Sequence, residues 1–129
     1  MNNLVRRIKI LTSSVGTLFA DLTDENPLTA DAFWEKLPIE GKANLWGDEI
    51  YFSTSISVET ENPRSIVNIG DVAYWPPGKA VCLFFGLTPA SRGNEIQPAS
   101  PVNVFGRIEN NVKLLKLIPF GEKVRLERG

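Results

Sequence analysis

The chain has 129 residues, of which 43% are hydrophobic, so it is long enough to bury one substantial core and too short for two domains of ordinary size. We therefore expect a single domain over residues 1–129. Fourteen basic and fifteen acidic residues nearly balance, and no basic cluster goes beyond Arg6-Arg7 and the tail near Arg125 and Arg128. Because neutralising phosphates needs a concentrated basic face, nucleic acid is not an expected partner.

The sequence holds no histidine and one cysteine, Cys82. The missing imidazole excludes Ser-His and Cys-His catalysis and removes the commonest transition-metal ligand. A single thiol also argues against a zinc site, so we expect neither a metal nor a cofactor. Cys82 lies between Val81 and Leu83, a setting typical of a small buried hydrophobe, whereas a nucleophilic thiolate would need a cationic neighbour.

The longest apolar run, residues 80–87, is far shorter than the roughly 20 residues that cross a bilayer, so no membrane span is expected. The first residues lead directly into a strand pattern, without the charged start, apolar stretch and cleavage site of a signal peptide. These features predict a cytoplasmic protein.

Alternation of apolar and polar residues predicts a hairpin at the start of the chain. In residues 4–11, Leu4, Ile8 and Ile10 share one face, and the alternation resumes over residues 16–22. A short helix follows, with Thr29 as its N-cap. Asp31 lies in its expected first turn, and the helix ends before Pro38.

The middle of the chain predicts more strands. Residues 39–46 and 49–53 form two strands joined at Gly47-Asp48, followed by a polar, irregular stretch over residues 54–64. Two apolar strands then flank the rigid Trp-Pro-Pro-Gly turn within residues 70–86. Residues 87–101 hold three prolines and form a long loop, and such loops are often functional when they are ordered.

Strand character returns over residues 102–108, and a helical turn is predicted after Asn110-Asn111. A last strand contains Val124 and Leu126. About eight strands with few helices favour a closed barrel or a sandwich.

Three motifs, in order, resemble those of cyclophilins. Residues 26–33, Asn-Pro-Leu-Thr-Ala-Asp-Ala-Phe, resemble the segment in which Pro-x-Thr opens a helix whose phenylalanine closes one barrel end. Residues 80–86 resemble the strand that brings paired phenylalanines to the barrel wall and substrate groove. Residues 104–108, Val-Phe-Gly-Arg-Ile, resemble the Val-Phe-Gly-x-Val strand.

The run 70–86 with Thr88-Pro89 is similar to a small, uncharacterised prokaryotic cyclophilin-like family. This resemblance implies a mainly β fold: a closed eight-stranded barrel with one short helix and a helical turn. An unrelated small β barrel is the alternative.

The residues of cyclophilin catalysis are mostly absent. A prolyl isomerase needs an apolar cup for the proline ring and a fixed donor near the prolyl nitrogen. In cyclophilins an arginine in a Phe-x-Arg strand is that donor, and a Phe-Met-x-Gln segment follows. Residues 49–54 contain no arginine, and residues 95–100 lack the expected tryptophan and histidine. Arg64 or Arg92 could supply a donor from a loop, although a solvated arginine is the ordinary role at both positions.

The candidate ligand-binding residues come from the aromatic groove and the loop beside it. Alternation places Glu49 and Tyr51 opposite Ile50 and Phe52, so they face a groove or solvent if the apolar pair faces the core. The remaining candidates are either pocket residues or have an ordinary structural role, in the core for the phenylalanines and in a turn for Thr88. The complete set is Glu49, Tyr51, Trp75, Phe84, Phe85, Thr88 and Pro89.

We therefore expect a cyclophilin-like domain that binds a proline-containing peptide or a small molecule in an aromatic groove without efficient catalysis. The alternative is a divergent peptidyl-prolyl cis-trans isomerase. A third hypothesis, acid/base catalysis, pairs Glu49 with Glu95 or Asp71. No residue is assigned a catalytic role, and a homodimer that covers exposed strand edges stays open.

Overall fold

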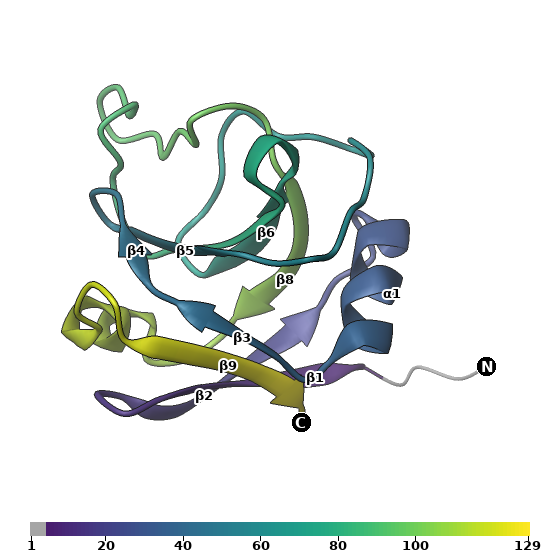
Figure 1. The fold of residues 1–129 in the computed structure, drawn as a ribbon. Coiled ribbons are helices and arrows are strands. Elements are labelled where there is room, and N and C mark those ends of the chain that lie inside the picture. The colour runs from purple at the N-terminus through teal and green to yellow at the C-terminus, as the bar shows by residue number, and fades with distance from the viewer. Residues whose placement is uncertain (1–4) are drawn as a thin grey trace.

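The structure, a computed structural model, describes residues 5–129. Leu4, which the sequence places on one strand face with Ile8 and Ile10, lies outside the described residues. Nine antiparallel strand segments form a nearly closed barrel (Figure 1). The strands are β1 (Arg7–Thr12), β2 (Gly16–Leu22), β3 (Ile39–Lys42), β4 (Asn44–Leu45), β5 (Glu49–Ser53), β6 (Asp71–Trp75), β7 (Ala80–Phe84), β8 (Asn103–Ile108) and β9 (Lys123–Arg128). The helices are α1 (Pro27–Lys36) and the 3-10 turns η1 (Pro76–Gly78) and η2 (Val112–Leu117).

The strand order is β3-β9-β1-β2-β8-β6-β7-β5-β4. β3 and β4 are two parts of the single strand that the sequence predicts over residues 39–46, so the predicted eight-stranded barrel is confirmed. The chain pairs first with β9 and then, beyond Ala43, with β5. A Cβ atom at Gly41 would lie 2.5 Å from the Phe52 ring, so glycine lets this ring fill the seam between β3 and β5.

Both ends of the barrel are covered (Figure 1). At one end, Phe33 of α1 stacks on Phe105 with the ring centroids 4.4 Å apart, and meets Tyr74 edge-on at 5.7 Å. At the other end, η2 buries Leu115 in the same core. Phe33 therefore has the position that the cyclophilin resemblance implied for it. Among residues 5–129, no helix is long and apolar enough to cross a membrane.

The start of α1 corrects the prediction that Thr29 is the N-cap. The N-cap residue is Asn26, because Pro27 takes the first helical position, where a missing N–H costs nothing. Asp31 therefore lies beyond the first turn. The side chain of Asn26 caps nothing; instead it donates to the Val104 carbonyl at 2.8 Å and ties the helix to β8.

A carboxylate from a distant loop satisfies the open N–H groups of α1. Glu61 accepts hydrogen bonds from the backbone N–H groups of Leu28 and Thr29, each at 3.0 Å, and from the Thr29 hydroxyl at 2.9 Å. A negative charge is also favourable at this end of the helix dipole. The segment 54–64, which the sequence predicts to be irregular, thus fixes the helix against the barrel.

We predict that Glu61→Ala lowers the free energy of unfolding by about 1–2 kcal/mol, because it leaves helix N–H groups without their acceptor. Urea denaturation measures this loss. Glu59→Ala is the control, since Glu59 is exposed and interacts with Asn103 through its backbone carbonyl. Equal effects of the two substitutions would contradict the role of Glu61.

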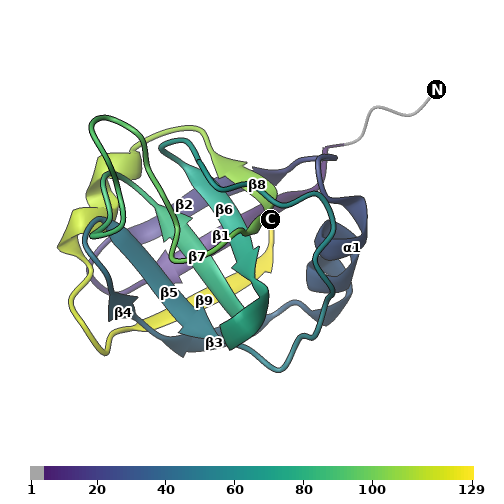
Figure 2. The same ribbon diagram turned by 90° about the horizontal axis from the view of Figure 1, so that it is seen from above.

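The strands β5, β7, β6 and β8 are buried on both faces. Their inner side chains belong to the barrel core, and their outer side chains form a second apolar cluster. The long loop 87–101 crosses this outer face (Figure 2), and Val67 and Ile96 from the two covering loops pack into the cluster. The residues of the cluster that come from the strands or directly precede β8 are Ala73, Cys82, Phe84, Val102 and Val104.

Candidate functional site

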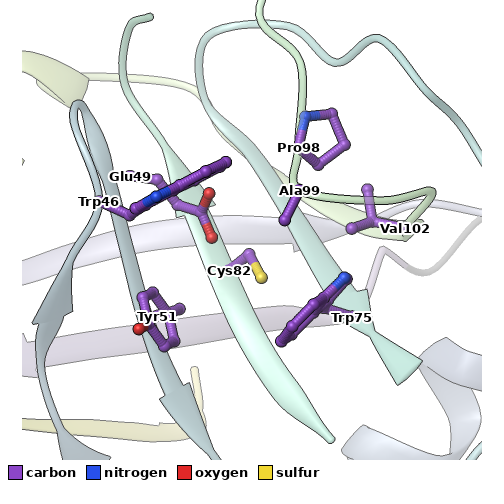
Figure 3. A pocket seen from close by; sticks show the side chains of 8 residues that line it. All are labelled: Trp46, Glu49, Tyr51, Trp75, Cys82, Pro98, Ala99 and Val102. Atoms are coloured by element: carbon purple, nitrogen blue, oxygen red, sulfur yellow. The ribbon is translucent and has the colours of Figure 1, made fainter. Parts of the chain in front are cut away.

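A pocket of about 210 Å³ opens in the outer face of the barrel, where the loop 87–101 covers the second cluster incompletely. Figure 3 shows side chains from several strands and from the loop around it. The lining residues are Trp46, Glu49, Tyr51, Trp75, Cys82, Pro98, Ala99 and Val102.

Strand alternation places the polar residues of the pocket. Ile50 and Phe52 of β5 are buried in the barrel core, so Glu49 and Tyr51 point to the outer face. In the antiparallel register with β7, Tyr51 lies opposite Cys82. Because side chains opposite each other on adjacent strands are neighbours, the thiol lies beside the phenol in the pocket floor.

A tight turn brings Trp46 to the edge of the pocket. The N–H of Trp46 donates to the Glu49 carbonyl at 3.0 Å across Gly47-Asp48. Gly47 has a φ of 61°, and a Cβ atom there would lie 2.8 Å from the Pro89 ring. Both the backbone conformation and the close approach therefore require glycine.

The opposite wall depends on a fixed tryptophan. The Trp75 indole N–H donates to the Ser100 hydroxyl at 2.6 Å, which orients the ring at the end of β6. Figure 3 shows the indole rings of Trp46 and Trp75 on opposite sides of the pocket, with Glu49 and Cys82 between them. The pocket is therefore walled by aromatic rings that belong to separate elements.

Thr88 organises the covering loop. Its hydroxyl donates to the Gln97 carbonyl and accepts from the Ala90 N–H at 3.2 Å. The Ser91 hydroxyl accepts from the N–H groups of Thr88 and Gln97, at 3.0 and 3.1 Å. These bonds join the two ends of the loop and hold the following residues, Pro98 and Ala99, over the pocket.

Glu49 is the unusual group of the site. The residue is only 5% exposed, and its Oε1 atom has no hydrogen-bond partner within residues 5–129. Burial raises its pKa from 4.5 to about 7, and a hydrogen bond with the facing Cys82 thiol acts in the opposite direction. A solvated glutamate, the ordinary alternative at this position, is therefore wrong. The pocket holds a carboxyl group that is close to half-ionised near neutral pH.

Cys82 is buried, as the sequence predicts. Burial raises the pKa of its thiol well above 9.0, and the neighbouring Glu49 charge raises it further. The thiol is therefore protonated at neutral pH and behaves as a small apolar surface with a weak donor.

The structure brings three of the seven candidate residues together in this pocket: Glu49, Tyr51 and Trp75. The other four lie outside its lining. Phe84 is fully buried in the second cluster, and Phe85 packs against the barrel core. Thr88 makes the local bonds described above, which is its ordinary turn role, and the exposed Pro89 packs against the turn at Gly47.

The arginines considered as isomerase donors, and the carboxyl groups considered as acid/base partners of Glu49, lie outside the pocket lining. Arg64 forms an ion pair with Glu25 at 2.7 Å, and Arg92 is exposed in the loop. Asp71 is buried and accepts from the Arg107 guanidinium at 3.2 Å. Glu95 is exposed, and neither it nor Asp71 lines the pocket beside Glu49.

Sequence reasoning missed five lining residues. Trp46 had a usable signal, because a two-residue turn at Gly47-Asp48 places it opposite Glu49. Cys82, Pro98, Ala99 and Val102 follow only from the pairing of distant strands and from the path of the loop. Within the described part of the chain, no group of three or more Cys, Asp and Glu side chains could hold a metal ion.

The nearly closed barrel with its single helix is consistent with a cyclophilin-like fold, and the sequence profile of the Cyclophilin-like family matches residues 6–127. The chain belongs to this family, as its motifs suggested. It is similar, at 47% identity over 100% of both chains and with a TM-score of 0.84, to the solution structure of the hypothetical protein AF2241 from Archaeoglobus fulgidus. No curated protein sequence matches the chain.

The raised pKa of Glu49 predicts that stability falls as pH rises from about 4.5 to about 7. In this range the unfolded chain has lost the proton that the folded protein retains, so the folded state binds more protons. The total effect is about 3 kcal/mol. Glu49→Gln removes it, so the variant should be more stable than the parent protein near pH 8 and similar to it near pH 4.

Urea denaturation at several pH values measures the free energy of unfolding of the parent protein and of Glu49→Gln. Glu95→Gln is the matched control, because Glu95 is exposed and should leave the pH profile unchanged. If Glu49→Gln retains the parent's decline in stability between acidic and neutral pH, burial of Glu49 is not its cause.

Proposed function

We propose that this protein is a ligand-binding member of its family, which holds a proline-containing peptide or a small molecule in the outer-face pocket without efficient catalysis. The observation that carries this proposal is a preformed aromatic pocket around the buried carboxyl group of Glu49, whose Oε1 atom has no hydrogen-bond partner among the described residues. Binding sites commonly combine an apolar wall with a few converging polar groups.

The size of the pocket favours a compact ligand. Pockets for drug-sized molecules are roughly 300–1,000 Å³, whereas this one is about 210 Å³. One ring or one branched head group therefore fits, and the rest of a larger ligand would lie outside. A proline ring has the required size and an apolar surface that packs well between indole rings.

The polar group of the pocket favours binding over isomerisation. A prolyl isomerase stabilises the twisted amide with a fixed donor near the prolyl nitrogen. Here the pocket is lined by the carboxyl group of Glu49, and Arg64 is engaged by Glu25. A carboxylate accepts hydrogen bonds, so it suits a ligand that brings its own donor.

The test is an NMR titration of the protein with an acetyl-Ala-Pro-amide peptide, N-acetyl-L-prolinamide and tetramethylammonium chloride. We expect at least one probe to shift the indole N–H resonances of Trp46 and Trp75. The peptide should show no acceleration of its slow cis/trans exchange. Ala99→Leu should abolish the shifts, because Ala99 lines the pocket and the larger side chain would occupy it.

Asn94→Leu is the matched control, since it adds the same side chain to an exposed position of the same loop outside the pocket lining. Acceleration of exchange that Ala99→Leu removes would establish the divergent isomerase instead. If none of the three probes shifts either indole resonance, the pocket is not a binding site of this kind.

A further inference from the structure

We infer that the pocket selects a cationic ligand, an organic ammonium group held between Trp46, Trp75 and the carboxylate of Glu49. This inference rests on the proposed function and specifies the chemical class of its ligand. Methylated amines, cyclic secondary amines and the ammonium of an N-terminal proline all belong to this class.

The walls have the chemistry of a cation site. Trp46, Tyr51 and Trp75 are all half-buried and line the same pocket, so their rings remain accessible to a ligand. Each indole ring turns a face toward the space between them (Figure 3). The face of an aromatic ring is electron-rich and attracts cations, tryptophan most strongly. Three such rings around one compact space are the arrangement that recognises quaternary ammonium groups.

The floor supplies the countercharge. Glu49 is 5% exposed, and its Oε1 atom has no partner among the described residues. A buried carboxylate with one oxygen that accepts no hydrogen bond, and with a weak thiol donor beside it, is unfavourable, because its desolvation is not compensated by an opposite charge. A bound ammonium group would supply that opposite charge, so the ligand would satisfy a group that the protein itself leaves unsatisfied.

Among residues 5–129, no lysine or arginine lines the pocket, so these walls would not repel a cationic ligand. The other titratable groups that line it are the Cys82 thiol of β7, which is protonated at neutral pH, and the Tyr51 phenol of β5. The other lining residues from this side are Trp75 of β6, Pro98 and Ala99 of the loop, and Val102, which directly precedes β8, and none of them titrates. The Asp48 carboxyl, on the adjoining turn, lies against Gly86.

A neutral ligand fits the geometry less well. A proline ring without charge would gain apolar contact with the indoles but would further desolvate the Glu49 carboxyl. It would therefore bind best when Glu49 is protonated, at low pH. A cation would bind best when Glu49 is ionised, at high pH. The two classes of ligand thus predict opposite pH dependences, which separates them experimentally.

The experiment compares tetramethylammonium chloride, whose charge is independent of pH, with neutral N-acetyl-L-prolinamide, using sodium chloride to match the ionic strength. Shifts of the Trp46 and Trp75 indole resonances report occupancy. We expect the affinity for tetramethylammonium to fall about tenfold between about pH 8 and about pH 6, because the ionised fraction of Glu49 falls by that factor. Binding of the cation should also release a proton below pH 7.

Two variants test the groups separately. Glu49→Gln should reduce the affinity for the cation at least about tenfold near pH 8 and remove its pH dependence. Trp46→Leu, which retains an apolar side chain, should reduce it roughly three- to tenfold. Asn94→Leu, the control, should change neither the affinity for the cation nor its pH dependence. Circular dichroism would establish that each variant folds.

The outcomes separate the inference from the proposed function. If N-acetyl-L-prolinamide binds and tetramethylammonium does not, the cationic class is wrong and the binding pocket stands. Equal affinity of the parent and Glu49→Gln for the cation would also overturn the inference. If neither compound nor the acetyl-Ala-Pro-amide peptide shifts the indole resonances, both the inference and the proposed function fail.

Discussion

Burial of both faces of the β5–β7–β6–β8 sheet is the constraint on which the rest of the molecule depends. All five residues of β7 are buried, as are four of the five in β6. Strands of this kind need cover on both sides. The barrel core covers the inner face, and the loops covering the outer face must lie close to it. The pocket exists where that second cover is incomplete.

The covering loop 87–101 therefore has a structural part, which contains Thr88 and Ser91, and a functional part, Pro98 and Ala99, which lines the pocket. Thr88 and Ser91, near the start of the loop, form hydrogen bonds with the backbone of Gln97 near its other end. The backbone N–H of Val67 donates to the Ile96 carbonyl at 2.9 Å. These contacts fix the position of Ala99 above the strands. A rigid scaffold that carries an ordered loop is a common way to build a binding site, because the loop can vary without disturbing the core.

The buried carboxyl of Glu49 is the clearest sign that the outer face has a functional role in addition to its packing role. An apolar residue at the same place would join the second cluster and avoid the desolvation of an acid. Natural proteins retain such unfavourable groups mainly where they act. Glu49 lies opposite Phe84 in the strand register, with Trp46 across the turn. Its carboxyl lines the pocket, and the Oε1 atom has no hydrogen-bond partner among the described residues.

The sequence by itself determined the strand pattern and that Glu49 and Tyr51 share one face of their strand, because alternation is a local property of extended chains. The choice of a barrel over a sandwich came from the family resemblance, and the burial of Ile50 and Phe52 in the core decided that Glu49 and Tyr51 point outward. Only the tertiary structure decided that Glu49 is buried, that Phe84 and Phe85 lie in different clusters and that Glu61 caps α1. Each of these depends on segments far apart in the chain, such as residues 61 and 28, or on the path of the loop over β7. Long-range packing of this kind leaves no periodic signal in the sequence, which is why the elements could be predicted and the lining of the pocket only in part.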